Sequence, residues 1–292
     1  MSPAQRVLRG AGARASRIAC RAGLAALVLA ALLAVPPVRA GELVQVAAHR
    51  ADPRHPDTAP PLYGFLTHPP GRGPFPAVVV LHGCAGFGQP DIAAAERLRA
   101  AGYLALALDS LGGTDACRMP GGAPAEARDA GAALRMLAAR PDVAAGRIAV
   151  LGFSMGGFAV LDLVTQGGGA PAAGPRFRAA VAFYPNCRFS TGVMTTPLLI
   201  LMGSADDWTP VAACRAILDR RAGRGAKVRL VVYPGATHAF DVPARAHTIL
   251  GHHIRYDAAA ARAAWGQVRA FLAAAFAQAL PPALPGGRVA PK

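Results

Sequence analysis

The chain has 292 residues, 53% of them hydrophobic, and a formal net charge of +15 at pH 7. Its basic residues are almost all arginines, and they are scattered along the chain without a stripe of interleaved aromatic residues. This distribution argues against nucleic-acid binding. The length suits one large α/β domain with a well-buried core, and no shift in composition indicates a second domain.

Residues 1–40 have the composition of a secretory signal peptide. Six arginines and no acidic residue lie in this segment, and the apolar run Leu24–Val35 precedes the A-x-A-like sequence Val38-Arg39-Ala40. That run is too short to span a bilayer comfortably, although an uncleaved anchor is the alternative. We expect cleavage near Ala40, which gives a secreted or periplasmic protein with no stable membrane anchor and a net charge of +9.

Short runs rich in Val, Ile and Leu then alternate with Ala- and Arg-rich stretches of helical length. Continuous apolar strands separated by helices are typical of a parallel sheet covered on both faces. The expected strands are Ala77–Leu81, Tyr103–Leu108, Ile148–Leu151, Ala179–Phe183, Leu198–Met202 and Val228–Val232. The expected helices between them are Asp91–Ala101, Pro124–Ala139, Gly156–Thr165 and Pro210–Ala222.

Both ends of this series carry further signals. Weaker strand patterns at Leu43–Ala48 and Leu62–Thr67 predict an antiparallel edge, and Ala258–Ala277 has the apolar spacing of a closing helix. Proline and glycine dominate after it. We therefore predict a single, mostly parallel, doubly wound α/β domain over residues 41–279, followed by a flexible tail over residues 280–292. Ligands of such sheets bind beyond the carboxyl ends of the strands.

The strongest chemical signal is the G-x-S-x-G sequence Gly152-Phe153-Ser154-Met155-Gly156, which follows an expected strand and precedes an expected helix. A serine on such a sharp, strained turn projects its hydroxyl into the cleft, and the flanking glycines remove side chains that would clash. A turn with no catalytic role is the alternative, because this chain has 33 glycines. The strand-before, helix-after context favours Ser154 as a nucleophile.

A serine hydroxyl needs a base, and His238 follows the last expected strand, at the edge where ligands bind. His247, His252 and His253 lie in a polar segment before the closing helix, where we expect them to face solvent. The pair His252-His253 is too isolated to predict a metal site.

The acid that orients the base should lie between Ser154 and His238 in the chain. Asp206 and Asp207 both follow the strand Leu198–Met202, and either could serve on the residues alone. A role as a turn or helix-cap residue is the alternative for each aspartate.

An oxyanion hole is expected in the segment His82-Gly83-Cys84-Ala85-Gly86, directly after a strand. The backbone N–H groups of Cys84 and Met155 are the candidate pair of donors. Cys84 as a thiol nucleophile is the weaker interpretation, because an oxidising compartment disfavours a free thiol. We expect His82 to hold the loop by hydrogen bonding.

Taken in order, these motifs resemble the dienelactone hydrolase family of α/β-hydrolases from about Leu62 to Leu272. The resemblance implies that the acid is Asp206, three residues after Gly203, and that the base is His238. It rests on Gly73-Pro-Phe-Pro-Ala-Val-Val-Val-Leu-His-Gly-Cys, Gly102-Tyr-Leu-Ala-Leu-Ala-Leu-Asp-Ser, Gly152-Phe-Ser-Met-Gly-Gly, Asp206-Asp-Trp-Thr-Pro and His238-Ala-Phe-Asp.

Two departures from the family pattern bear on the substrate. The founding dienelactone hydrolases have a cysteine nucleophile where this chain has Ser154, and a glutamate where it has Gly83. That glutamate helps to activate the thiol, so both parts of the specialised mechanism are missing together. We therefore expect a serine carboxylesterase or lactonase-like enzyme that works through an acyl-enzyme.

The resemblance also bears on the four cysteines that remain after cleavage. In the expected fold, Cys84 and Cys117 lie on adjacent loops, and so do Cys187 and Cys214. The implied disulfides are Cys84–Cys117 and Cys187–Cys214, as suits an exported chain.

The expected substrate is a small ester or lactone, with Phe87, Tyr184 and Trp208 as candidate pocket residues. No phosphate loop or dinucleotide fingerprint is present, so no cofactor is implied. A peptidase or thioesterase of the same fold is one alternative function. A non-catalytic binding protein that kept the fold is another.

Overall fold

A computed structural model describes residues 41–46, 61–110, 122–169, 174–190 and 192–278. The expected signal peptide with its cleavage site, the tail over residues 280–292, and Cys117 lie outside the described residues. Most of the helices and strands follow the apolar pattern of the sequence closely.

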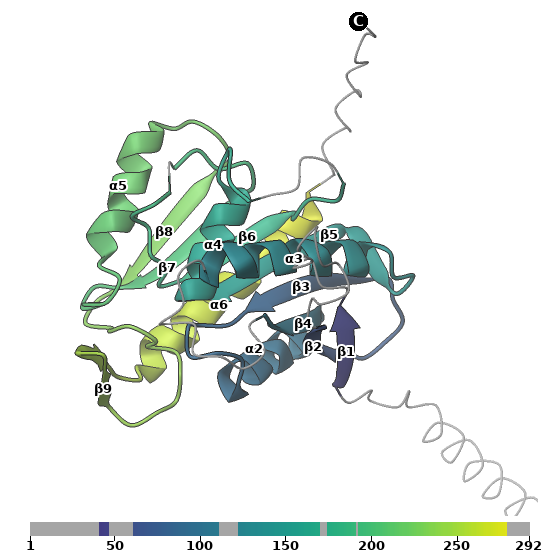
Figure 1. Cartoon of the computed structure of the whole chain (residues 1–292), viewed down its shortest axis with the longest axis horizontal. Coiled ribbons are helices and arrows are strands. Elements are labelled where there is room, and N and C mark those ends of the chain that lie inside the picture. Colours follow the sequence, from purple (N-terminus) through teal and green to yellow (C-terminus); the bar gives the residue numbers. More distant parts are fainter. Residues whose placement is uncertain (1–40, 47–60, 111–121, 170–173, 191, 279–292) are drawn as a thin grey trace, which may run out of the picture. The chain divides into compact units, whose positions relative to one another are not determined.

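The described residues form a mostly parallel eight-stranded sheet in the order β1-β2-β4-β3-β5-β6-β7-β8 (Figure 1). β3 to β8 run parallel, whereas β1 and β2 make the predicted antiparallel edge. The strands are β1 (Glu42–Val46), β2 (Leu62–Thr67), β3 (Phe75–Leu81), β4 (Leu104–Asp109), β5 (Val143–Phe153), β6 (Ala179–Phe183), β7 (Leu198–Gly203) and β8 (Val228–Tyr233).

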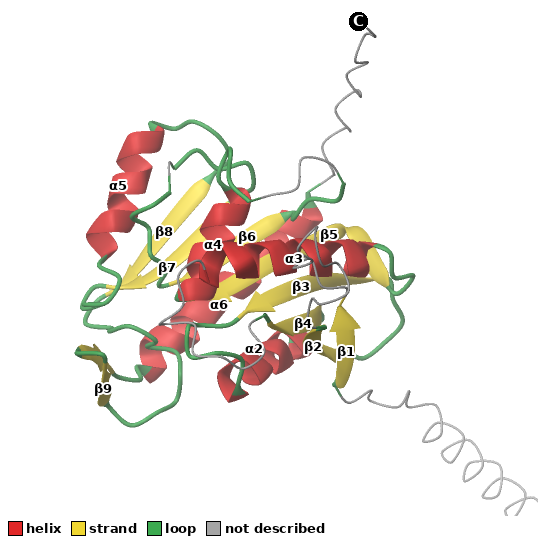
Figure 2. Cartoon of the chain, in the orientation of Figure 1, coloured by secondary structure: helices red, strands yellow, loops and turns green. Residues whose placement is uncertain are grey.

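Helices cover both faces of this sheet, as Figure 2 shows in red. α3 and α4 lie in front of the sheet in Figure 1, and α6 passes behind it. The helices are α2 (Gln89–Ala100), α3 (Gly122–Ala138), α4 (Met155–Val164), α5 (Val211–Arg221) and α6 (Ala258–Ala277). The fold is therefore the predicted α/β arrangement with helices on both faces.

Burial explains why the central strands read as continuous apolar runs. Every residue of β6 and β7 is buried, because each strand is flanked by other strands and covered by helices on both faces. β8, at the edge of the sheet, keeps only Tyr233 buried.

Within the described part of the chain, no helix is both long enough and apolar enough to cross a membrane.

The segment after His238 contains an element that the sequence analysis did not predict. This polar approach to the closing helix forms a hairpin of β9 (His247–Ile249) and β10 (His252–Ile254). Leu250 and Gly251 connect the strands with φ angles of 50° and 87°. Two residues with positive φ match the twist of a two-residue hairpin turn.

Candidate active site

Ser154 lies on the sharp turn between β5 and α4, with a φ angle of 52°. The flanking glycines are required by close backbone contacts. A Cβ on Gly152 would lie 2.2 Å from the carbonyl oxygen of Gly156, and a Cβ on Gly156 would lie 2.5 Å from the carbonyl oxygen of His82. The G-x-S-x-G pattern is therefore a steric requirement of this turn.

The structure brings Ser154, His238 and Asp206 together from three separate loops at the carboxyl end of the parallel strands. Nε2 of His238 lies 2.9 Å from the Ser154 Oγ, and Nδ1 lies 2.9 Å from Oδ2 of Asp206. A carboxylate only accepts hydrogen bonds, so Nδ1 carries the proton and Nε2 is left to accept one from the serine hydroxyl. This is the geometry of a nucleophile, a base and an orienting acid.

Hydrogen bonds from its own loop hold the Asp206 carboxylate in place. The backbone N–H groups of Trp208 and Thr209 donate to Oδ1 over 3.0 and 2.8 Å. The Thr209 hydroxyl lies 2.9 Å from Oδ2. Asp207 points elsewhere, because its carboxylate lies beside His252 and accepts the backbone N–H of His253. Of the two candidate acids, Asp206 is the one next to the imidazole.

The predicted oxyanion loop borders the serine. A Cβ on Gly83 would lie 3.8 Å from the Cβ of Ser154, and Cys84 lines the same cavity as Ser154. Met155 is the first residue of α4, whose N-terminal N–H groups are free of intrahelical partners. His82 is fully buried, and its Nδ1 donates to the carbonyl oxygen of Gly83 over 2.7 Å. His82 thus holds the loop, as its position predicts.

Tyr184 and Asp241 form a buried pair beside the imidazole that sequence reasoning did not find. The Tyr184 phenol donates to Oδ1 of Asp241 over 2.7 Å, and its ring centroid lies 4.7 Å from that of His238. Tyr184 has a φ angle of 37°, and its carbonyl oxygen lies 3.1 Å from the Thr209 hydroxyl. Burial is the main cause that raises the pKa of both side chains. The one sequence signal that could have pointed to this pair is Asp241 itself, the aspartate three residues after His238 in His-Ala-Phe-Asp.

A cavity of about 390 Å³ opens beside Ser154 and His238, which is large enough for a small ligand. Its lining is mostly apolar and includes Phe87, Tyr184 and Trp208, the three residues proposed for the pocket from the sequence. It also includes Asp91, a residue of α2 whose pKa burial raises to about 6.

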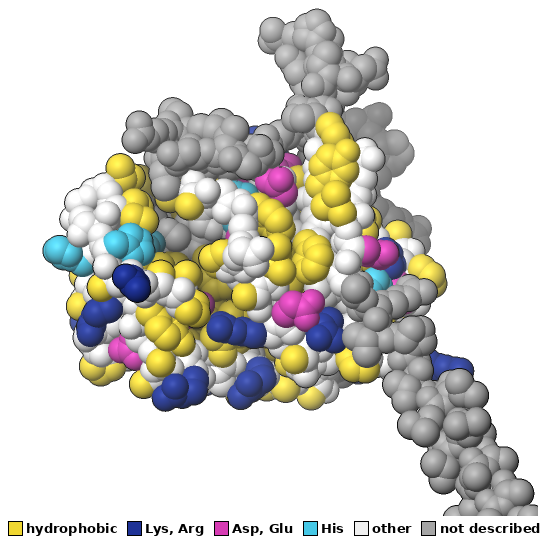
Figure 3. Space-filling model, turned by 90° about the horizontal axis from the view of Figure 1, so that it is seen from below, with side chains coloured by type: hydrophobic (Ala, Val, Ile, Leu, Met, Phe, Trp, Pro, Cys, Tyr) yellow, Lys and Arg dark blue, Asp and Glu magenta, His cyan; other side chains and the backbone are white. Residues whose placement is uncertain are grey.

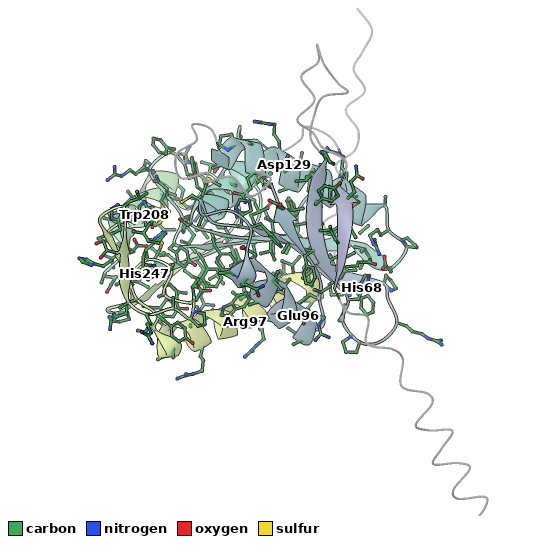
Figure 4. All side chains as sticks on the ribbon, turned by 60° about the horizontal axis from the view of Figure 1, so that its bottom comes forward. His68, Glu96, Arg97, Asp129, Trp208 and His247 are labelled. Carbon is green, nitrogen blue, oxygen red and sulfur yellow. A yellow bond between two sulfur atoms is a disulfide. The ribbon has the colours of Figure 1, made fainter. Side chains whose placement is uncertain are left out.

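The hairpin contributes one wall of this cavity through His247 and Ile249. Figure 4 labels His247 close to Trp208, at the far end of the molecule from His68. The Trp208 ring stacks on His252 at 4.8 Å and packs against His238 at 5.0 Å. His252, which we expected to face solvent, is half-buried, because its ring stacks on Trp208.

Cys187, after β6, and Cys214, in α5, form a disulfide. It is one of the two pairs that the family resemblance implied. The bridge ties the loop after Tyr184 to the helix that follows Asp206. Among the described residues, no group of three or more His, Cys, Asp or Glu side chains is arranged to hold a metal ion.

The sequence matches the dienelactone hydrolase family over residues 62–276. The chain belongs to the dienelactone hydrolase family. No curated protein sequence matches it. This dienelactone hydrolase family member is accordingly a hydrolase that acts on carboxylic ester bonds.

Solved structures share the fold at low sequence identity. A dienelactone hydrolase-like promiscuous phosphotriesterase, P91, from metagenomic libraries has a TM-score of 0.65 and 23% identity over 81% of this chain and 99% of its own. Esterase 2 of Thermogutta terrifontis with bound propionate has a TM-score of 0.60 and 19% identity, over 82% of this chain and 96% of its own. The same esterase phosphorylated by paraoxon has a TM-score of 0.62 and 18% identity, over 82% of this chain and 95% of its own.

Proposed function

We propose that this protein is an exported serine carboxylesterase, with Ser154 as nucleophile, His238 as general base and Asp206 as the orienting acid. The observation that carries the proposal is the pair of 2.9 Å distances that join the imidazole to the serine hydroxyl and to the carboxylate. The substrate would be a small ester or lactone bound in the cavity next to Ser154.

The proposed reaction follows from these contacts. Nε2 of His238 takes the hydroxyl proton while Oγ of Ser154 attacks the ester carbonyl. Asp206 stabilises the resulting imidazolium through Nδ1. The N–H groups of Cys84 and Met155 are the proposed donors to the oxyanion. The imidazolium then protonates the leaving alcohol, and a water molecule activated by the same base hydrolyses the acyl-enzyme and regenerates the serine.

A phosphonate probe tests the nucleophile without knowledge of the substrate. We expect a fluorophosphonate to label the purified protein, and Ser154→Ala to abolish both the label and the hydrolysis of p-nitrophenyl butyrate. Ser204→Ala is the matched control, because Ser204 is exposed and lies outside the cavity. If Ser154→Ala keeps the label, or if the wild-type protein never takes it, the proposal is wrong and a binding protein on the same fold is favoured.

Paraoxon provides an independent reagent. The esterase of Thermogutta terrifontis is phosphorylated by paraoxon, and this chain shares its fold. We expect paraoxon to inactivate the protein and to add one diethylphosphoryl group to the peptide that contains Ser154, as measured by mass spectrometry. Labelling of a different residue would contradict the assignment.

Export is proposed from the N-terminal composition, and the Cys187–Cys214 disulfide supports it, because such bonds persist in oxidising compartments. The mass of the protein recovered from the periplasm or medium of an expressing bacterium tests it. We expect a chain that begins at Gly41, whereas a full-length chain retained in the membrane fraction would favour the uncleaved anchor.

A further inference from the structure

Two buried carboxylates line the cavity next to Ser154. Asp91 and Asp241 both contribute to its wall, although each residue is only 4% exposed. Asp91 lies in the first turn of α2 and accepts the backbone N–H of Gly88, while Asp241 accepts the phenol of Tyr184. Buried carboxylates are costly to ionise, and burial is the main cause that raises the pKa of each one. The charge of Asp241 raises the pKa of Asp91 further. Both costs fall when a cation binds nearby.

Aromatic side chains surround these carboxylates. Aromatic faces attract cations, including quaternary ammonium groups, because the ring quadrupole is negative on its face. One side chain of the cavity wall already makes this contact, since the Arg97 guanidinium carbon lies 5.2 Å from the Trp265 ring centroid. The aromatic lining residues are Phe87, Phe153, Tyr184, Trp208 and Trp265.

Tyr184 sets the distance between the negative charge and the reacting atoms. One end of its side chain hydrogen-bonds Asp241, and its ring packs against the imidazole of His238. Tyr184 therefore contacts both the Asp241 carboxylate and the proposed base.

The other charged or titratable lining groups offset only part of this field. Arg97 lowers the pKa of Asp241 through its positive charge, whereas the pKa of Asp91 is shifted by burial, backbone hydrogen bonds and the charge of Asp241. Arg97 and His247 are exposed to solvent, where water and salt screen part of their charge. Figure 3 shows lysine and arginine side chains as separate spots among hydrophobic ones on one face of the molecule. The phenol of Tyr184 stays uncharged because its pKa is well above the ordinary value. His238 is the base itself.

We propose that this cavity selects esters that carry a cationic group, such as a quaternary ammonium, a few bonds from the scissile carbonyl. Asp91 and Asp241 attract the cation, the aromatic faces contact it, and the same carboxylates repel an ester that carries a carboxylate. This inference rests on the proposed esterase function and names the substrate class of that site. Below pH about 6, where Asp91 gains a proton, the preference weakens.

The test compares three p-nitrophenyl esters of matched length: γ-trimethylammoniobutyrate, its neutral tert-butyl isostere and the glutarate monoester. Rates are corrected for spontaneous hydrolysis and expressed as kcat/KM ratios, so that a general loss of activity cancels. We expect wild type to prefer the cationic ester over the anionic one by about a hundredfold, and Asp91→Asn to reduce that ratio by about tenfold. The exposed Asp219→Asn is the matched control with the same charge change and the wild-type ratio.

Asparagine can still accept the Gly88 N–H, so the variant is expected to fold. Its ratio should change less between pH 5 and pH 8 than the wild-type ratio, which should rise across that range as Asp91 ionises. A wild-type ratio near one, or an Asp91→Asn ratio equal to that of Asp219→Asn, overturns the inference while leaving the esterase intact. Failure to hydrolyse any of the three esters, including the neutral one, overturns the proposed function and the inference together.

Discussion

The hydroxyl of Thr209 offers a sharp test of how the proposed acid is held. This hydroxyl lies within hydrogen-bond distance of Oδ2 of Asp206, the Tyr184 carbonyl and Nδ1 of His238. It has one proton, and the carboxylate is the strongest acceptor of the three, so we expect it to donate to Asp206. Thr209→Val removes that donor at nearly constant volume.

The expected magnitude follows from the donors that stay. A hydrogen bond to a charged group contributes ~1.5–3 kcal/mol. Two backbone N–H groups continue to hold Oδ1 of Asp206 in the variant. We therefore expect the lost stabilisation to lie at the lower end of this energy range. An increase of ~1.5 kcal/mol in the activation barrier lowers kcat roughly tenfold, with little change in KM.

The assay is steady-state hydrolysis of p-nitrophenyl butyrate, with Thr209→Ser as the matched control that keeps the hydroxyl. We expect Thr209→Ser to retain most of the wild-type kcat. If the valine and serine variants lose activity equally, the effect comes from packing and the reasoning is wrong. A valine variant with unchanged kcat and unchanged Tm refutes it as well.

Three further changes test the turn, the buried carboxylate and the disulfide. Gly156→Ala places a Cβ 2.5 Å from the His82 carbonyl oxygen, so we expect a loss of several kcal/mol of stability and no measurable activity, as followed by urea denaturation and ester hydrolysis. Asp91 has a pKa raised from 3.8 to about 6, so the folded wild type is destabilised by ~3 kcal/mol once Asp91 is ionised in both states. Asp91→Asn should therefore raise Tm at pH 8, and this advantage should shrink as the pH falls through 6 and vanish near 4; an advantage independent of pH contradicts it. Replacing Cys187 and Cys214 by alanine removes a link between residues 27 positions apart and should cost ~3 kcal/mol of stability. We also expect a lower kcat, because the bridge joins segments next to Tyr184 and Asp206. An unchanged Tm of the double variant, measured without reducing agent, would argue against any role for the bridge.

Local patterns in the sequence predicted most of the architecture. The strands of the sheet centre are apolar at every position because helices and neighbouring strands bury both faces, and this burial leaves a continuous signal. The turn at Ser154 was readable because steric crowding at Gly152 and Gly156 admits only glycine. The hairpin was missed, because each of its strands has three residues and β9 is exposed throughout.

The sequence did not show in the same way which side chains of the site contact each other. The residues alone left Asp206 and Asp207 open, and only the family resemblance favoured Asp206 before the structure was considered. The two side chains are adjacent in the chain but point in different directions, one to His238 and the other to His252. Side-chain direction in a loop depends on contacts with distant segments, which sequence spacing does not encode.

The amino-acid sequence by itself therefore determined the layered α/β fold and the strained serine turn, because both depend on periodicity and on local steric limits. Only the tertiary structure decided that Thr209 faces the acid and that Asp91 and Asp241 line the cavity. The physical reason is that a carboxylate's role depends on its burial and its neighbours. Those neighbours come from α2, from the loop after β6 and from α6, which are far apart in the chain and meet only when the sheet is assembled.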